Sequence, residues 1–344
     1  MKNLIESHRV ILCVGSGGVG KTSVSAALAV AAAQSGKKVA VLTIDPSQRL
    51  AQTFGIAKGQ GLTLVPGQNY SGKIYAATLD HTKVFDDFVK RSVKSPELAE
   101  KIMKNKLYQR MATDLSGSQE FTSLETLYTT HASGEFDLVI LDTPPTKHAV
   151  DFLRSPALLA RVFNDKIARW FRNPQSQNAR LFDKIFYAGT KQVLKVLELL
   201  TGSDFVSELA DFFSNIESWQ QKIRGRVLDV QKMLESNETA FVMVSVFDRC
   251  KLIEANYLAQ EITKSGFHFK AIVFNRVFPT WLVQTHNAQD PLFQNMKTYY
   301  SEREQFFEQS LQTKSFADAE KIKIPDLFDE VASLQNLEEI CKYL

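Results

Sequence analysis

The feature that most constrains the fold is a glycine-rich segment between two apolar runs near the start of the 344-residue chain. Val10–Val14 is continuously apolar, as is typical of a strand buried on both faces of a sheet. Thr22–Gln34 favours a helix, and Gly36 is placed to end it. Lys38–Asp45 is a second buried strand. Two strands joined through a helix form a βαβ unit, which requires parallel strands and a right-handed crossover.

The alternation of strands and helices continues along the chain. Helical patterns separate four further apolar strands, which are predicted at Ile74–Leu79, Phe136–Asp142, Ala240–Phe247 and Phe269–Asn275. This alternation predicts an α/β fold with a doubly wound, mostly parallel sheet.

One long segment lacks strand patterns. From about residue 150 to 236 only helical periodicity is found, as in the apolar stripe from Phe205 to Ile223 and the stripe from Val227 to Leu234. We therefore expect a helical insertion subdomain at 150–236 between two parts of one core, 1–149 and 237–344. The stripe at Phe205 to Ile223 either packs inside the protein or lines an apolar groove.

The glycine-rich segment Gly15–Thr22 reads GSGGVGKT and matches the pattern of a phosphate-binding loop, G-x-x-x-x-G-K-[ST]. Glycines let main-chain N–H groups turn inward around phosphate oxygens, and the following helix adds its positive end. The lysine would neutralise the β- and γ-phosphates, and the threonine hydroxyl would bind Mg²⁺. The residues expected to surround the phosphates are Gly15, Ser16, Gly17, Gly18, Val19, Gly20, Lys21, Thr22 and Ser23.

A dinucleotide-binding fold is the alternative interpretation of the same loop. Gly15, Gly17 and Gly20 also fit G-x-G-x-x-G, and Asp45 closes the second strand about where such a fold keeps its ribose-binding acid. A nicotinamide oxidoreductase has no use for the Lys21-Thr22 pair, however, and a second phosphate-site element lies downstream.

That second element is a pair of aspartates at predicted strand ends. Asp142 ends a strand beside the loop, where a carboxylate typically holds Mg²⁺ together with a hydroxyl such as that of Thr22. Asp45 ends the strand at the same carboxyl edge, where ligands bind. Asp45 is predicted to position an attacking water or to contact Mg²⁺, and it can also cap the helix that follows Pro46.

A base pocket is predicted from two weaker signals. Asn275 ends its strand at the carboxyl edge, and its amide matches the donor and acceptor edge of adenine. Pro325 opens the segment Pro325–Phe328, which would form a wall beside the base.

Composition excludes several functional classes. The 41 basic and 38 acidic residues are too balanced to indicate a nucleic-acid partner. The three cysteines are far apart in the sequence and form no CxxC pair, which favours unpaired thiols in a reducing cytoplasm and no metal besides Mg²⁺.

Segment 83–110 holds eight basic and four acidic residues. It is predicted to be a solvated helical face, with peripheral contact to an anionic membrane or partner as the alternative.

Taken together, these motifs resemble the ArsA/GET family of deviant P-loop ATPases. This family includes arsenite-pump ATPases and the targeting factor for tail-anchored membrane proteins. The segments that carry the resemblance are GSGGVGKTS at Gly15–Ser23, TIDPSQRL at Thr43–Leu50, DTPPTKH at Asp142–His148, FNRV at Phe274–Val277 and the long helical insertion.

The resemblance implies an ATP-driven dimer, either a homodimer or a heterodimer with a related ATPase, with nucleotide near the interface. It implies that Lys21 and Thr22 bind phosphate and Mg²⁺ and that Asp45 is the catalytic switch I aspartate that activates water. It further implies that Asp142 is the switch II aspartate and Asn275 the adenine reader. In targeting members the helical insertion forms an apolar groove for a client.

The chain departs from this family at one loop position. Standard members carry a lysine as the second residue of the loop, which reaches the partner's phosphates, and this chain has Ser16 there. A cation at this point of phosphoryl transfer can be worth ~10³–10⁵ in rate. We expect Lys147, Arg49 or a cation from another protomer to replace it, or hydrolysis to be slow. With negligible hydrolysis, the chain would be a nucleotide-dependent binding module or chaperone, which is the alternative function. No close set of cysteines for arsenite or zinc is present in the sequence, which disfavours a metalloid pump.

Overall fold

The computed structural model describes residues 1–43, 49–56, 61–92, 95–104, 116–143, 217–279, 290–327 and 333–344. The chain divides into two compact units. The first contains Met1–Leu79, Thr126–Leu153 and Gln231–Leu344, and the second contains Asp80–Glu125 and Arg154–Val230.

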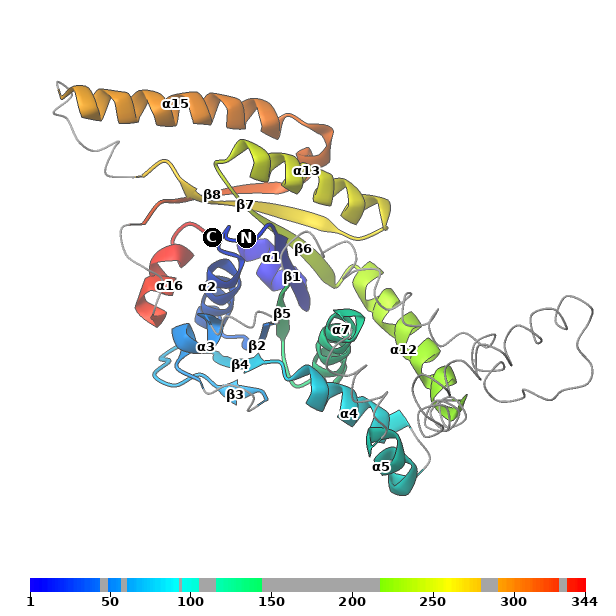
Figure 1. Cartoon of the computed structure of the whole chain (residues 1–344). Coiled ribbons are helices and arrows are strands. Elements are labelled where there is room, and N and C mark those ends of the chain that lie inside the picture. The colour runs from blue at the N-terminus through cyan, green and yellow to red at the C-terminus, as the bar shows by residue number, and fades with distance from the viewer. Residues whose placement is uncertain are drawn as a thin grey trace, which may run out of the picture. The chain divides into compact units, whose positions relative to one another are not determined.

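The first unit is built on a sheet whose eight strands, within the described residues, follow the order β3-β4-β2-β5-β1-β6-β7-β8 (Figure 1). The strands are β1 (Val10–Gly15), β2 (Lys38–Thr43), β3 (Thr63–Leu64), β4 (Lys73–Thr78), β5 (Leu138–Asp142), β6 (Thr239–Val246), β7 (Phe269–Val277) and β8 (Glu320–Pro325). All neighbouring strands are parallel except β3 and β4. The predicted α/β class with a mostly parallel sheet is confirmed.

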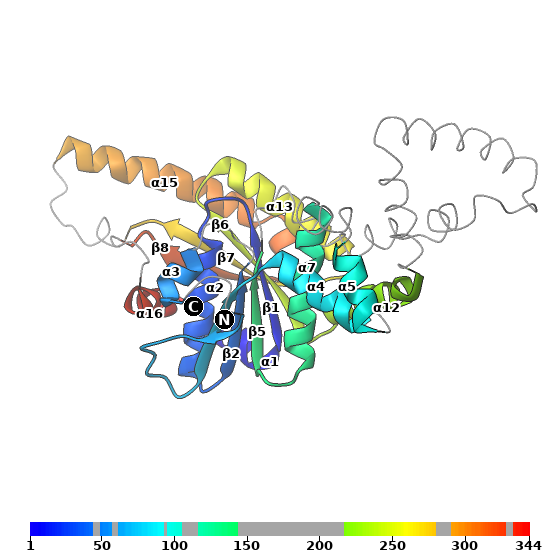
Figure 2. The ribbon, with the colours of Figure 1, turned by 60° about the horizontal axis from the view of Figure 1, so that its bottom comes forward.

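Helices cover both faces of this sheet. The helices of the unit are α1 (Lys2–Ser7), α2 (Lys21–Gln34), α3 (Arg49–Phe54), α13 (Arg249–Lys264), α15 (Pro291–Leu311) and α16 (Leu334–Cys341), with a short 3₁₀ turn η2 (Lys314–Phe316). Ile11 and Cys13 of β1 lie in one apolar cluster with α2 and α16. Leu12 lies outside this cluster, because successive side chains of a strand alternate between faces. Figures 1 and 2 show α13 on the opposite side of the sheet from α2.

The strand order decides between the two interpretations of the glycine loop. β5 pairs with both β1 and β2, so the first two long strands of the chain are not neighbours. A dinucleotide-binding fold places its first two strands side by side. The inserted strand ends at Asp142, which brings that carboxylate next to the loop after β1. This strand order argues against the oxidoreductase alternative and favours the interpretation of the glycine-rich segment as a phosphate-binding loop.

The second unit is helical in its described residues. It contains α4 (His81–Ser92) and α5 (Pro96–Lys104), and it shares α7 (Ser116–Ala132) and α12 (Glu217–Glu235) with the first unit. The helical prediction for 227–234 is confirmed. Residues 144–216 lie outside the described residues, and they include most of the expected insertion and most of the stripe from Phe205 to Ile223. The boundaries at 149 and 236 therefore stay a prediction.

Glu125 is a fully buried carboxylate in the described part of this helical unit. Glu125 of α7 has Arg226 Nε 2.9 Å from its Oε2 and Arg91 Nη2 3.5 Å from its Oε1. Burial raises the pKa of Glu125 to about 7, while the two guanidinium groups act in the opposite direction. Among the described helices, none combines the length and the apolar character needed to cross a membrane.

Candidate functional site

The loop between β1 and α2 requires glycine at two positions. Gly15 has φ +153°, and a Cβ there would lie 2.2 Å from the main-chain oxygen of Val244 on β6. Gly20 has φ +91°, and a Cβ there would lie 2.2 Å from Nδ2 of Asn275 on β7. Both backbone angles are unfavourable for residues with a side chain. The loop therefore packs closely against β6 and β7 at these two glycines, and this packing fixes its backbone conformation.

Lys21 begins α2 and folds back over the loop. Its side chain is buried, and Nζ donates a hydrogen bond to the main-chain oxygen of Ser16 at 2.9 Å. Three groups thus lie together at the start of α2: the ammonium group, the glycine-rich main chain and the N-terminus of this 14-residue helix. This combination of positive groups suits a polyphosphate.

Asp142 lies directly beside the loop, as predicted. In the strand register it pairs with Cys13 of β1 and Thr43 of β2, and it is 1% exposed. Its Oδ2 accepts hydrogen bonds from Thr22 Oγ1 at 2.6 Å and from Thr43 Oγ1 at 3.1 Å. The first bond joins the end of β5 to the start of α2, so the two predicted metal-binding side chains are in contact.

The oxygen atoms around Asp142 fit Mg²⁺. Mg²⁺ prefers hard oxygen ligands and is usually held by one or two carboxylates together with phosphates and waters. The carboxylate of Asp142 and the hydroxyl of Thr22 supply such ligands next to the loop. Across the described ranges there is no group of three acidic, histidine or cysteine side chains that could hold another kind of ion.

Asn275 contacts the loop itself. Its side chain is buried, and Nδ2 donates to the main-chain oxygen of Val19 at 3.0 Å. Asn275 therefore supports the loop in a way that the sequence did not indicate. Pro325 ends β8 at the same carboxyl edge, where it pairs with Val277. The structure brings both predicted base-pocket residues to one edge of the sheet, and their contact with adenine stays a prediction.

Other predicted site residues are not described. Asp45 and Lys147 lie outside the described residues, and Arg49 is described only as the first residue of α3, without its side chain. Their roles therefore stay predictions.

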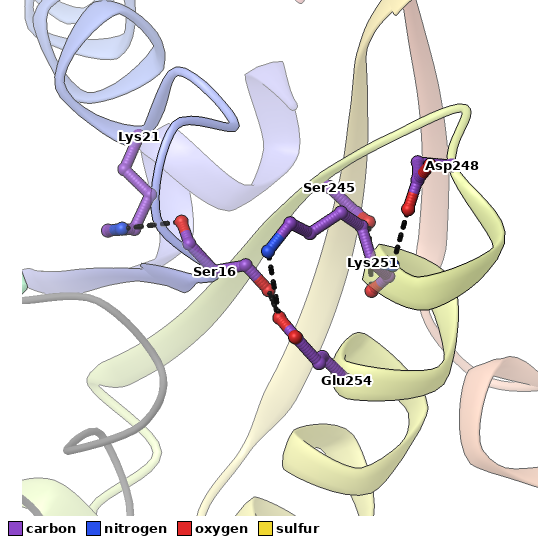
Figure 3. A network of polar contacts seen from close by, with 6 residues as sticks. All are labelled: Ser16, Lys21, Ser245, Asp248, Lys251 and Glu254. Carbon is purple, nitrogen blue, oxygen red and sulfur yellow. Dashed lines mark hydrogen bonds and ion pairs between the residues drawn. The ribbon is translucent and has the colours of Figure 1, made fainter.

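Ser16, by contrast, is placed clearly. It is buried, and its hydroxyl donates a hydrogen bond to Oε2 of Glu254 on α13 (Figure 3). Neither Glu254 nor the hydroxyl of Thr43 was predicted at the site. The contact between Ser16 and Glu254 depends on the pairing of β1 with β6, and no local pattern in the sequence signals it.

The surroundings of Cys13 and Cys341 disfavour the thiolate form of these side chains. Burial raises the pKa of Cys13 to about 12, and it raises the pKa of Cys341 to about 12 as well. The thiol of Cys341 donates to the main-chain oxygen of Ala27 at 3.1 Å. Because thiolates are the metal-binding form of cysteine, these two residues are unsuited to binding a metalloid.

Comparison with known proteins agrees with this geometry. The model of the anion-transporting ATPase family, ArsA ATPase, matches residues 8–344. The chain is 26% identical to ATPase ASNA1 homolog 2 of Paramecium tetraurelia, over all of this chain and 96% of the relative. It is 25% identical to ATPase GET3 of Malassezia globosa, over all of this chain and 93% of the relative. It is 24% identical to a protein provisionally named arsenical pump-driving ATPase 1 of Aquifex aeolicus, over 98% of this chain and 78% of the relative.

The family model covers nearly the whole chain, and the strand order, the loop and the buried aspartate are those expected of a nucleotide-hydrolysing core. The chain belongs to the anion-transporting ATPase (ArsA) family and is an ATPase.

Proposed function

We propose that the protein is a Mg²⁺-dependent ATP hydrolase that works as a nucleotide-controlled dimeric switch and couples ATP to the binding of a protein client. The observation that carries this proposal is the hydrogen bond of 2.6 Å between Thr22 Oγ1 and Asp142 Oδ2. It links the phosphate loop to Asp142, the switch II aspartate that begins the segment Asp142–His148, which we call the switch segment. Thr22 and Asp142 are the residues that would hold Mg²⁺, which would supply positive charge beside the phosphates, so the nucleotide state would be transmitted to the chain after Asp142.

Each residue has a role in this proposal. Lys21 neutralises the β- and γ-phosphates, and Thr22 and Asp142 hold Mg²⁺, which supplies charge stabilisation for phosphoryl transfer. Asp45 activates the attacking water. Asn275 and Pro325 border the adenine.

The start of the switch segment is anchored in the core. Thr143 Oγ1 donates to the main-chain oxygen of Cys13 at 2.8 Å, next to the residue pair that joins β1 and β5. A change at Asp142 therefore occurs at a fixed point of the chain. Order and release of the segment beyond it provide the two states of a switch.

The dimer and the client are inferred from the relatives. The chain is similar over its full length to proteins named ASNA1 homolog and GET3, and the family resemblance implies dimers that act on protein clients. A heterodimer with a related ATPase is compatible with the same proposal. A cytoplasmic location belongs to the proposal and rests on the same resemblance.

A metalloid pump is the second candidate, because one relative carries that name. The raised pKa values of Cys13 and Cys341 count against thiolate binding by these residues.

The test of the switch is the hydrodynamic state of the purified chain. Sedimentation velocity with ADP, and with a slowly hydrolysed ATP analogue plus Mg²⁺, should give a dimer whose sedimentation coefficient differs between the two nucleotides. Asp142→Asn should remove the difference, whereas Asp137→Asn at the other end of β5 should keep it. A monomer in all conditions, or one sedimentation coefficient with both nucleotides, would contradict the switch.

A further inference from the structure

A lysine from α13 lies close to the loop position at which the sequence lacks one. Lys251 Nζ is 3.2 Å from Glu254 Oε2, and the same oxygen accepts the hydroxyl hydrogen of Ser16. Figure 3 shows Lys21 and Lys251 reaching Ser16 from different elements, the first at its main-chain oxygen and the second through Glu254. The ammonium group of Lys251 is thus two polar contacts away from the hydroxyl of Ser16.

The fold fixes the start of α13 beside the loop. Gly15 at the end of β1 pairs with Val244 of β6, so β6 ends next to the loop. Asp248 then caps α13, and its Oδ1 accepts the main-chain N–H of Lys251 at 3.0 Å. Lys251 is therefore held at the first turn of α13 by its main chain. The side chain of Lys251 is 32% exposed, and its four-carbon chain is flexible, so the ammonium group is able to move.

We propose that Lys251 is the catalytic cation that contacts the terminal phosphate of ATP in place of the missing loop lysine. Ser16 keeps the short side chain that lets Glu254 approach the loop, and Glu254 holds the ammonium group there before ATP binds. The terminal phosphate competes with Glu254 for Lys251 mainly in the transition state of phosphoryl transfer. This assignment rests on the proposed nucleotide site, and it places the cation on α13 instead of at Lys147 or Arg49.

A second lysine on the same helix provides a matched control. Lys264 Nζ lies 3.1 Å from Glu261 Oε1, which repeats the lysine–glutamate spacing of three residues near the other end of α13. Lys264 is 67% exposed and lies at the last residue of α13, whereas Lys251 lies in its first turn. The two pairs share their chemistry and differ in their distance from the loop.

The test is ATP turnover by the full chain. Lys251→Met should lower kcat about 10²–10³-fold, because one charge that stabilises the transition state is lost. The dissociation constant for a slowly hydrolysed ATP analogue with Mg²⁺ should change little, since the contact is made mainly in the transition state. Lys251→Arg should retain most of the activity, and Lys264→Met should match the wild type. Ser16→Lys should restore turnover in the Lys251→Met background.

Two results would overturn the proposal. The first is wild-type kcat in Lys251→Met. The second is an equal loss in Lys251→Arg and Lys251→Met, which would show that the positive charge is not the reason for the effect. The role of Lys251 is tested by the rate of ATP turnover, whereas the nucleotide-controlled switch is tested by sedimentation. A failure of the Lys251 proposal can therefore be distinguished from a failure of the proposed function.

Discussion

The two ends of strand β5 carry aspartates with opposite surroundings. Asp137 precedes the strand on its amino side, is exposed, and accepts the main-chain N–H of Lys38 at 2.8 Å. Asp142 ends the strand, is buried, and accepts the hydroxyl hydrogens of Thr22 and Thr43. The first carboxylate joins two strands. The second carboxylate accepts hydrogen bonds from side chains at the start of α2 and on β2. A bound ligand can replace these hydrogen bonds.

The same difference holds for the two edges of the sheet. At the amino edge, Thr239 Oγ1 donates to the main-chain oxygen of Met233 at 2.6 Å, and His8 Nδ1 lies 3.0 Å from the main-chain oxygen of Leu4. At the carboxyl edge, Ser16 and Thr22 bond to carboxylates. The hydroxyl–carboxylate contacts lie beside the buried ammonium group of Lys21 at the carboxyl ends of parallel strands, where ligands of α/β sheets bind. The Thr239 contact lies at the opposite ends of the strands and stabilises the fold.

The largest effect should come from Lys21 at the carboxyl edge. Lys21→Met removes the buried ammonium group that faces the loop, so ATP turnover should fall by about 10³-fold or more. Steady-state phosphate release measures this effect, with the circular dichroism spectrum as the control for folding. Turnover at the wild-type rate would show that the loop does not hold the phosphates.

The next largest effect should separate the two aspartates. Asp142→Asn keeps the shape of the side chain and removes the charge, so kcat should fall about 10²-fold and the Mg²⁺ concentration for half activity should rise. Asp137→Asn should leave both unchanged. A magnesium titration of ATPase activity checks both variants, and equal behaviour of the two would refute the contrast between the two ends of β5.

A substitution at the amino edge should change stability without changing turnover. Thr239→Val removes a buried hydroxyl that bonds to Met233, and it should lower the free energy of unfolding by about 1–2 kcal/mol. Urea unfolding measures the loss. The kcat should equal that of the wild type, and a loss of kcat without a loss of stability would contradict the division between the edges.

The smallest effect concerns two histidines near the amino edge. Burial lowers the pKa of His8 and of His131 below the ordinary value. The unfolded chain then binds protons more readily than the folded one, so stability from these groups is complete above about pH 6.5 and decreases as the pH falls below it. The slope of unfolding free energy between pH 5 and 7 should be reduced in His8→Gln, and an unchanged slope would remove His8 from this effect.

The sequence predicted the central strands well because each is a continuous apolar run. The six predicted strands are present, and their ends differ from the predicted ones by one or two residues within the described ranges. β8 was missed because the sequence of this edge strand, EKIKIP, exposes its lysines and lacks such a run. β3 was missed because it has only two residues and its pairing depends on β4.

At the site, the sequence predicted what depends on local motifs. The loop, Lys21 and the position of Asp142 follow from residues close together along the chain. The contacts of Glu254 with Ser16 and of Asn275 with Val19 join residues more than 200 positions apart, and only the pairing of β6 and β7 with the rest of the sheet creates them.

Calorimetric titration of the purified chain with nucleotides is the most direct test of the carboxyl edge as the nucleotide site. ATP and ADP should bind with measurable heat, Mg²⁺ should strengthen the binding of ATP, and NAD should give none. The Lys21→Met variant should lose nucleotide binding. The Asp142→Asn variant should still bind ATP, but Mg²⁺ should no longer strengthen that binding. No heat with ATP and Mg²⁺, or wild-type affinity in Lys21→Met, would contradict a nucleotide site at this edge.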